Sequence, residues 1–213
     1  MARAGQAADA SVASVVADNA RVIGATIATE RRLPSPNGKE GWWVVLGGDG
    51  RLLRQETPSD TTTYYEGPAG HERRVKLLCP PRDQAWFYEG ARGEEHLVRM
   101  QYSSGKVMHY VGDRGKERLR RIEFPGGLVQ HYEGDDQCAE HVVRVEWPSG
   151  NWGTYEGPKN RERKVTFVRA SDGAVFFYTG DVYLERLVRV EFPNGQVQHF
   201  EGPQGNERCV WVE

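Results

Sequence analysis

Hydrophobic and polar side chains alternate in short segments along most of the chain, and each segment is followed by a turn. In residues 185–202, Val188, Val190 and Phe192 alternate with residues of which two are charged. This is the period of a β-strand with one apolar face. The turn Pro193-Asn194-Gly195 follows, because proline presets its own dihedral and glycine tolerates positive ones. A second strand over residues 196–201 completes the segment, so the pattern predicts a β-hairpin.

The hairpin pattern recurs with a fixed period. An aromatic-x-Gly motif ends each unit, its glycines stand 22 or 23 residues apart, and Glu-Arg or Glu-His follows every one. A fixed period in this range indicates a repeat array, in which each unit buries its apolar surface on its neighbours. Tyr65 and Gly67 form the first motif, and the structural repeat positions predicted after it are Tyr88, Gly90, Tyr110, Gly112, Tyr132, Gly134, Tyr155, Gly157, Tyr178, Gly180, Phe200 and Gly202.

The expected fold is therefore all-β: an elongated, twisted array of antiparallel hairpins over residues 34–213. The register within a hairpin stays open at this point. A four-residue loop pairs Phe192 with Val197, whereas a three-residue loop shifts the pairing by one residue and exchanges the faces of the second strand.

Residues 192–202, with a turn glycine, an aromatic residue and a second glycine, resemble MORN (membrane occupation and recognition nexus) repeats. The similarity covers roughly residues 36–213; where MORN units usually carry His-Gly-x-Gly, this chain has Glu-Arg or Glu-His. The RHS-type Tyr-Asp repeat is a second, lower-ranked resemblance. The MORN resemblance implies a non-catalytic protein–protein interaction or scaffold protein, and it also implies membrane-proximal placement.

The two ends of the chain differ from the repeats. Residues 1–33 are expected to form a cap or tail, with a helix that places Val12, Val15, Val16, Ile23 and Ile27 on one side. A terminal cap, a targeting or docking helix and a disordered tail remain alternatives. Residues 211–213 stand halfway through a hairpin, which predicts an open strand edge and edge-to-edge association through the last strand.

Charge and cysteine content narrow the functional classes. The 28 basic and 30 acidic residues are balanced, so binding to nucleic acid through bulk charge is not expected. No run of 18 apolar residues occurs, and a spanning helix is not expected. Cys79, Cys138 and Cys209 occupy different repeat positions, which favours a reducing, intracellular compartment, either cytoplasmic or organellar.

The candidate binding residues are exposed aromatic side chains and a row of arginines that share one repeat position. Glutamates follow three of these arginines two residues later, at Glu123, Glu146 and Glu191, which predicts stripes of alternating charge. The predicted binding residues are Trp42, Trp86, Trp152, Arg99, Arg121, Arg144 and Arg189.

The sequence predicts neither metal, cofactor nor catalytic residues. His109 and His131 occupy one repeat position, about 10 Å apart in successive hairpins, which is too far for one metal ion. The Glu-Arg pairs recur in every repeat, so they are interpreted as closing the turn by hydrogen bonds and ion pairs. A carbohydrate or other ligand-binding protein, and an enzyme with its site in the groove of the array, are the alternative functions.

Overall fold

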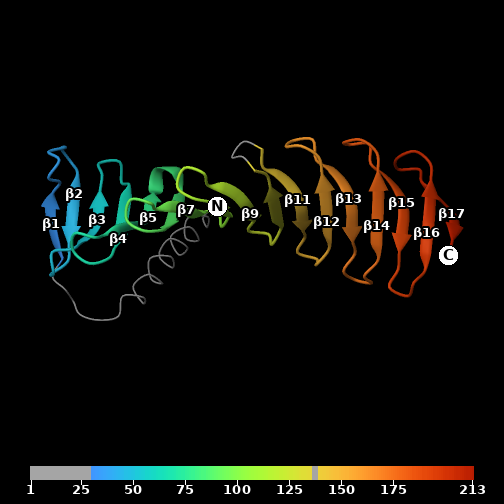
Figure 1. Ribbon diagram of the computed structural model, residues 1–213, viewed down its shortest axis with the longest axis horizontal. Coiled ribbons are helices and arrows are strands. Elements are labelled where there is room, and N and C mark those ends of the chain that lie inside the picture. The colour runs from blue at the N-terminus through green and yellow to red at the C-terminus, as the bar shows by residue number, and fades with distance from the viewer. Residues whose placement is uncertain (1–29, 136–138) are drawn as a thin grey trace, which may run out of the picture. The chain divides into compact units, whose positions relative to one another are not determined.

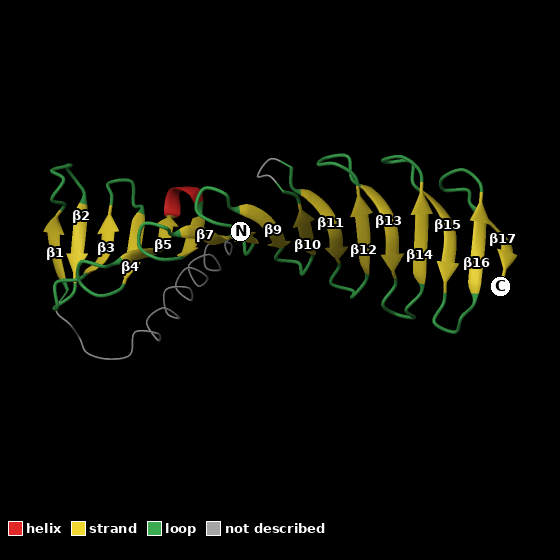
Figure 2. Ribbon diagram, in the orientation of Figure 1, coloured by secondary structure: helices red, strands yellow, loops and turns green. Residues whose placement is uncertain are grey.

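The computed structural model describes residues 30–135 and 139–213, so the predicted N-terminal cap lies outside the described residues. The described chain is all-β, with seventeen strands and one short 3-10 helix (Figure 2). It divides into two compact units, in which the described residues are 30–106 and 113–115 in unit 1, and 107–112 and 116–213 except for 136–138 in unit 2. The predicted all-β class and hairpin architecture are confirmed.

Successive strands pair antiparallel within each unit, so each unit is a meander (Figure 1). Unit 1 contains β1 (Arg31–Pro34), β2 (Trp43–Leu46), β3 (Leu52–Glu56), β4 (Thr62–Glu66), β5 (Arg73–Cys79), the 3-10 helix η1 (Pro80–Arg82), β6 (Gln84–Glu89) and β7 (His96–Tyr102). Unit 2 contains β8 (Val107–Val111), β9 (Arg118–Glu123), β10 (Val129–Glu133), β11 (His141–Glu146), β12 (Trp152–Glu156), β13 (Arg163–Val168), β14 (Val175–Thr179), β15 (Arg186–Glu191), β16 (Val197–Glu201) and β17 (Arg208–Val212). β1 begins at Arg31, three residues before the predicted start of the array.

The short turns settle the register that the sequence left open. Between β15 and β16, the amide of Gly195 donates to the Phe192 carbonyl at 2.9 Å, and Glu191 pairs with Val197. This is the three-residue loop, closed by a glycine with φ of +88°. The β13–β14 loop is one residue longer, because the amide of Gly173 donates to Arg169 instead, which accounts for one of the 23-residue periods.

The longer turns come with a β-bulge that the sequence did not reveal. Phe177 pairs with Arg189, but its neighbour Tyr178 pairs with Leu187, so Val188 is an extra residue on β15. The same shift occurs in the other long-turn hairpins of both units. A bulge reverses the alternation locally; Leu187 therefore lies on the same face as Val190, although the sequence pattern separates them.

Each unit has one face that carries most of the charge, here called the charged face. Its central row, read from strand to paired strand, contains Arg54, Tyr64, Lys76, Phe87 and Arg99 in unit 1. The row in unit 2 contains His109, Arg121, His131, Arg144, Thr154, Thr166, Phe177, Arg189, His199 and Trp211. Residues two positions away on the same strand share this face where no bulge lies between them, as Glu191 does with Arg189.

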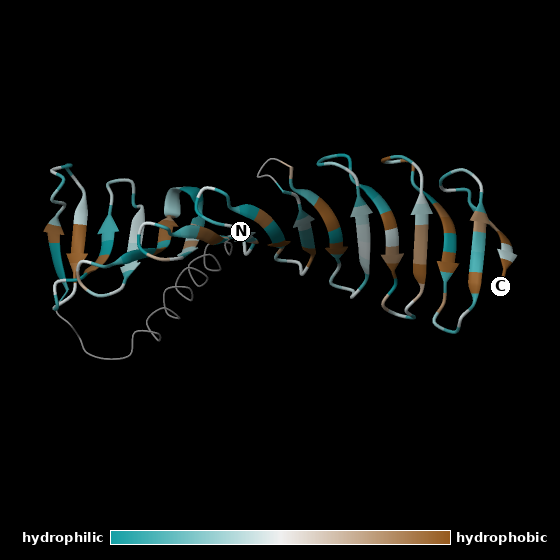
Figure 3. Cartoon of the chain, viewed as in Figure 1, coloured by the Kyte–Doolittle hydropathy of each residue, from teal (hydrophilic) through white to brown (hydrophobic). Residues whose placement is uncertain are grey.

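The opposite face, here called the apolar face, carries the repeat tyrosines and most of the buried side chains. Figure 3 shows hydrophobic and hydrophilic residues following one another along single strands such as β15. Burial raises the pKa of Tyr132, Tyr155 and Tyr178. Few hydrophobic residues in the described ranges are buried; they are Val45, Tyr88, Ile122, Val145, Ala174 and Val190. Each unit therefore depends on contacts between adjacent strands more than on a central core.

Candidate functional site

In six repeats, the glutamate of the Glu-Arg or Glu-His motif links its repeat to the one before it. Glu185 Oε1 accepts a hydrogen bond from the backbone amide of Lys164 at 3.2 Å, 21 residues earlier in the chain. Lys164 directly precedes the bulge residue Val165. A backbone amide beside a bulge loses its regular ladder partner, and the carboxylate replaces it. The same contact joins Glu72 to Leu52, Glu95 to Arg74, Glu140 to Leu119, Glu162 to Val142 and Glu207 to Leu187.

The glutamate also closes its own turn. Glu95 Oε2 accepts from the amide of Gly93 at 3.0 Å while Oε1 accepts from the preceding repeat. The hydrogen bond from the Leu52 amide lowers the pKa of the equivalent Glu72, because a charged acceptor is stabilised by each donor. The contact within the turn agrees with the interpretation of the glutamate as a turn closure. The second contact of this glutamate, to the preceding repeat, was not predicted from the sequence.

The arginine of the motif completes the link in the other direction. Arg118 Nη1 donates to the carbonyl of Gly134, the repeat glycine of the next repeat, at 3.0 Å. Arg73, Arg163 and Arg186 make the corresponding contact. The bulge, the glutamate, the arginine and the repeat glycine together are here called the repeat joint. Its polar groups are occupied by the backbone, which leaves the charged face as the candidate functional surface.

Three of the predicted arginines form ion pairs on the charged face of unit 2. Arg121 pairs with Glu123, Arg144 with Glu146 and Arg189 with Glu191, at N–O distances of 3.4, 2.9 and 3.0 Å. These side chains are 37–44% exposed. An exposed pair contributes only about 0.2–1 kcal/mol to stability. The main effect of these pairs is therefore to give the surface a regular pattern of charge.

Histidines extend these pairs. His109 lies 3.0 Å from Glu123, and His131 lies 3.2 Å from Glu146. Both histidines flank Arg121 in the central row. Across residues 30–135 and 139–213, no group of three His, Cys, Asp or Glu side chains is arranged to hold a metal ion.

Aromatic rings on the charged face are covered by cations. The guanidinium of Arg144 lies 4.1 Å from the centre of the Trp152 ring, and that of Arg189 lies 4.1 Å from Phe177. His199 stacks on Trp211 with ring centres 4.9 Å apart. Trp152 and these arginines therefore belong to one surface, as the sequence predicted for the arginines.

The other two predicted tryptophans do not join such a strip. Trp42 lies in the turn before β2, with the Lys39 ammonium 5.0 Å from its ring. Trp86 lies on the apolar face, where it pairs with Met100 and donates to Gln84. Sequence reasoning treated the tryptophans as one class because it could not assign faces without the register.

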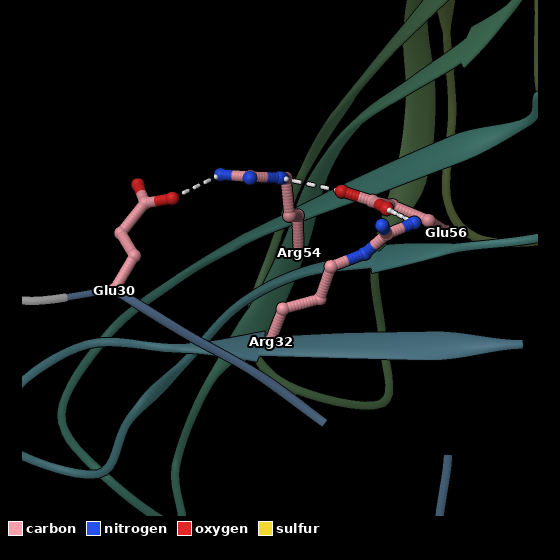
Figure 4. A network of polar contacts seen from close by, with 4 residues as sticks. All are labelled: Glu30, Arg32, Arg54 and Glu56. Atoms are coloured by element: carbon pink, nitrogen blue, oxygen red, sulfur yellow. Dashed lines mark hydrogen bonds and ion pairs between the residues drawn. The ribbon is translucent and has the colours of Figure 1, made fainter. Parts of the chain in front are cut away.

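Unit 1 begins with a four-residue charge network on its charged face (Figure 4). Arg54 lies between Glu30 and Glu56, with N–O distances of 2.8 and 3.0 Å, and Arg32 reaches the other oxygen of Glu56 at 2.7 Å. The hydrogen bond from Arg54 lowers the pKa of Glu56. A pocket of about 290 Å³ opens beside Arg32, Trp43 and Glu56, at the lower end of ligand-pocket sizes of roughly 300–1,000 Å³.

The next cations along unit 1 lack such partners. Lys76 and Arg99 flank the ring of Phe87, at 5.3 and 3.9 Å from its centre. The positions two residues later, which hold glutamate in the repeats with ion pairs, hold Leu78 and Gln101. Among the described residues, no carboxylate forms an ion pair with Lys76 or Arg99.

Two further observations bear on identity and placement. No protein-family model matches the chain, and no curated protein matches it. The MORN resemblance therefore stays a prediction based on residues 36–213. Within the described part of the chain, no helix is long and apolar enough to cross a membrane.

Proposed function

We propose that this chain is a non-catalytic protein–protein interaction or scaffold protein that binds a protein partner through its charged face. The observation that carries the proposal is that different side chains of a repeat form the joint and the charged face. The Glu-Arg motif is used by the joint, whereas the ion-paired rows of Arg121, Arg144 and Arg189 face solvent without an internal structural task of similar weight. Charge patterns of this kind select a partner and fix its register.

The spread of the pattern supports a scaffold in preference to a single reaction centre. The arginines recur on three strands of unit 2, β9, β11 and β15, while β13 carries Thr166 at the same position. Each arginine adds a contact along the sheet. Such a surface suits an extended partner, because binding energy is then distributed over several repeats. The MORN resemblance supports the same class and adds membrane-proximal placement as part of the proposal.

A capture experiment with charge reversal tests this function. The full chain and a variant with Arg121→Glu, Arg144→Glu and Arg189→Glu are immobilised, and bound proteins from the source cells are identified by mass spectrometry. A matched control reverses three exposed cations outside the β-strands: Arg82→Glu, Lys116→Glu and Arg161→Glu. A partner retained by the wild type and the control but lost from the charged-face variant supports the proposal. Equal capture by all three proteins contradicts it.

Ligand binding at unit 1 is the second proposal, because the small pocket beside Arg32 and Trp43 offers a cation-stacked ring. Titration of neutral oligosaccharides against Trp fluorescence tests it. A saturable change that Trp43→Phe removes supports ligand binding, whereas no change with any sugar is evidence against the carbohydrate form.

The last strand and the cysteines add two narrower proposals. Every residue of β17 is exposed, and among the described strands only β16 pairs with it. We infer edge-to-edge association at β17. Sedimentation of the wild type and of Val212→Pro tests this association.

Cys79 and Cys209 are free thiols, which supports a reducing intracellular compartment.

A further inference from the structure

Lys76 has an environment that an ammonium group rarely occupies without a carboxylate. The residue is only 9% exposed. Its Nζ lies 5.8 Å from the centre of the Tyr64 ring and 5.3 Å from that of Phe87. Buried charges in proteins are normally paired, because desolvation disfavours the isolated ion. The two rings offset part of that cost through cation–π attraction, but they do not neutralise the charge.

A second cation makes this environment less favourable. Arg99 lies on the other side of Phe87 from Lys76 in the central row, with its guanidinium 3.9 Å from the centre of the Phe87 ring. Burial, and after it the positive charge of Arg99, lower the pKa of Lys76. Two like charges therefore share one patch, and a bound anion would relieve both the desolvation and the repulsion.

The chain itself shows which anion suits this position. Arg121, Arg144 and Arg189 occupy the repeat position of Arg99, and each is paired with the carboxylate of the glutamate two residues later. At the same distance from Arg99 the chain has Gln101, and at the same distance from Lys76 it has Leu78. The patch of Lys76 and Arg99 thus repeats a carboxylate site from which the carboxylate has been omitted.

The neighbouring row admits an acidic ligand. Next to Lys76 and Arg99, the row on the charged face reads Thr62, Leu78, Ala85 and Gln101. The carboxylate beyond Thr62 in this row, that of Glu56, is already paired with Arg54 and Arg32. The backbones of β5 and β7 lie two strand spacings apart, about 10 Å, with Phe87 between the cations. An extended segment with several carboxylates can reach both, whereas one compact anion is smaller than this span.

We propose that Lys76 and Arg99, with the rings of Tyr64 and Phe87, form a binding site for acidic side chains of an extended peptide segment of a protein partner. This inference deepens the proposed interaction function and rests on it. It assigns the acidic segment to the part of unit 1 around β5 and β7, where the positions two residues after Lys76 and Arg99 hold Leu78 and Gln101 in place of glutamate.

Peptide titration tests the site directly. The full-length chain is titrated into a labelled poly-glutamate peptide at low ionic strength, and fluorescence anisotropy is recorded. We expect saturable binding that Lys76→Met, Arg99→Gln and Gln101→Glu each weaken by about fivefold, the equivalent of roughly 1 kcal/mol per pair. Gln101→Glu is the most informative variant, because it adds the internal carboxylate found in other repeats and removes no side chain that contacts the rings. Circular dichroism confirms that each variant is folded.

Arg189→Gln is the matched control. Arg189 covers Phe177 in the same way that Arg99 covers Phe87, at 4.1 Å, but it is already paired with Glu191. We expect its loss to change the affinity less than twofold. An equal loss in Arg189→Gln and Arg99→Gln would show unspecific attraction and overturn the site, and so would unchanged binding by Gln101→Glu.

The other sources of negative charge are separate arms of the test. Inorganic phosphate and vesicles containing phosphatidylserine are titrated in place of the peptide. Binding of either one without binding of poly-glutamate overturns the assignment to a peptide. If a captured protein partner tolerates Gln101→Glu but not reversal of the unit 2 arginines, the site is wrong while the interaction function stands. If poly-glutamate binds as expected but capture is equal for all variants, the interaction function is wrong and the site survives as an anion site.

Discussion

Phe87 in unit 1 and Phe177 in unit 2 occupy the same repeat position, and each has an arginine on the neighbouring strand, 3.9 and 4.1 Å from its ring centre. The residue two positions after the arginine differs: it is Gln101 in unit 1 and Glu191 in unit 2. Only the arginine of unit 2 is therefore paired on its own strand. The joints of the two units are alike in Glu95 and Glu185. The comparison shows that the glutamate link of the joint is the same in both repeats while the charged face differs, which is the pattern that the proposed recognition function predicts.

The largest effect is expected at the repeat glycines, and it should be equal in the two units. A Cβ on Gly90 would lie 2.7 Å from the Glu94 carbonyl oxygen, and one on Gly180 would lie 2.5 Å from that of Leu184. Both glycines also have positive φ, +108° and +120°. Gly90→Val and Gly180→Val should each lower the free energy of unfolding by more than about 2 kcal/mol, measured by urea denaturation.

Two glycines in open short turns are the controls for this prediction. Gly50 and Gly195 have positive φ, but a Cβ on either one would have no neighbouring atom within 4 Å. Gly50→Ala and Gly195→Ala should therefore lose only about 1 kcal/mol. If they lose as much as the valine variants, the close approach of the backbone is not what the repeat glycine provides.

The joint glutamates come next. Glu95→Ala and Glu185→Ala remove the acceptor for the bulge amides of Arg74 and Lys164, so each should lower the free energy of unfolding by about 1–2 kcal/mol. Glu89→Ala and Glu201→Ala, which change exposed glutamates of the aromatic-x-Gly motif, should lie within about 0.5 kcal/mol of the wild type. A joint substitution that matters in one unit only would separate the units where we expect them to be alike.

Acidification should weaken the joints of both units. The hydrogen bond from the Leu52 amide lowers the pKa of Glu72. Hydrogen bonds from the backbone amide of Glu207 itself and from that of Leu187 lower the pKa of Glu207. A carboxyl group whose folded pKa is depressed contributes stability above its unfolded pKa of about 4.3, and this is lost as pH falls through the folded value. The melting temperature should therefore fall more steeply below about pH 4.3 in the wild type than in Glu72→Gln or Glu207→Gln. Parallel curves for all three proteins would contradict the role of these charges.

The smallest effect, and the one where the units should differ in sign, is on the charged face. Arg189→Gln removes the exposed pair with Glu191 and should lower the free energy of unfolding by about 0.2–1 kcal/mol. Arg99→Gln removes a like charge near Lys76 and should leave stability unchanged or slightly higher. Chemical denaturation at low and high salt measures both, since screening should shrink the difference. Equal losses in the two variants would remove the contrast between the units.

The sequence predicted the features that depend on local chemistry. Alternation at Val188, Val190 and Phe192 predicted a strand, and the turn residues at Pro193-Asn194-Gly195 predicted its end; both agree with β15 and the loop after it. The charge stripes also followed, since residues two apart on a strand share a face.

The rest depended on pairing, which a single strand does not encode. Loop length sets the register, and both lengths fitted the residues around Gly195. The bulge at Val188 appears only when Tyr178 is seen opposite Leu187. For the same reason, the partner of each joint glutamate could not be predicted, because it lies about one period away in the chain. The recurrence of one glutamate beside every long turn was the available signal for a shared contact.

The central claim is that repeats are held to their neighbours by equivalent joints, and deletion of one period tests it most directly. Removing residues 158–180 deletes β13 and β14 and brings Glu185 into the chain position of Glu162, where it can accept from the Val142 amide. Removing only residues 158–168 deletes β13 and leaves β14 without an antiparallel partner on that side. We predict that the first variant is soluble, β-rich and cooperatively unfolded by urea, with a smaller m-value, and that the second is unfolded or insoluble. The same outcome for both deletions would contradict the claim.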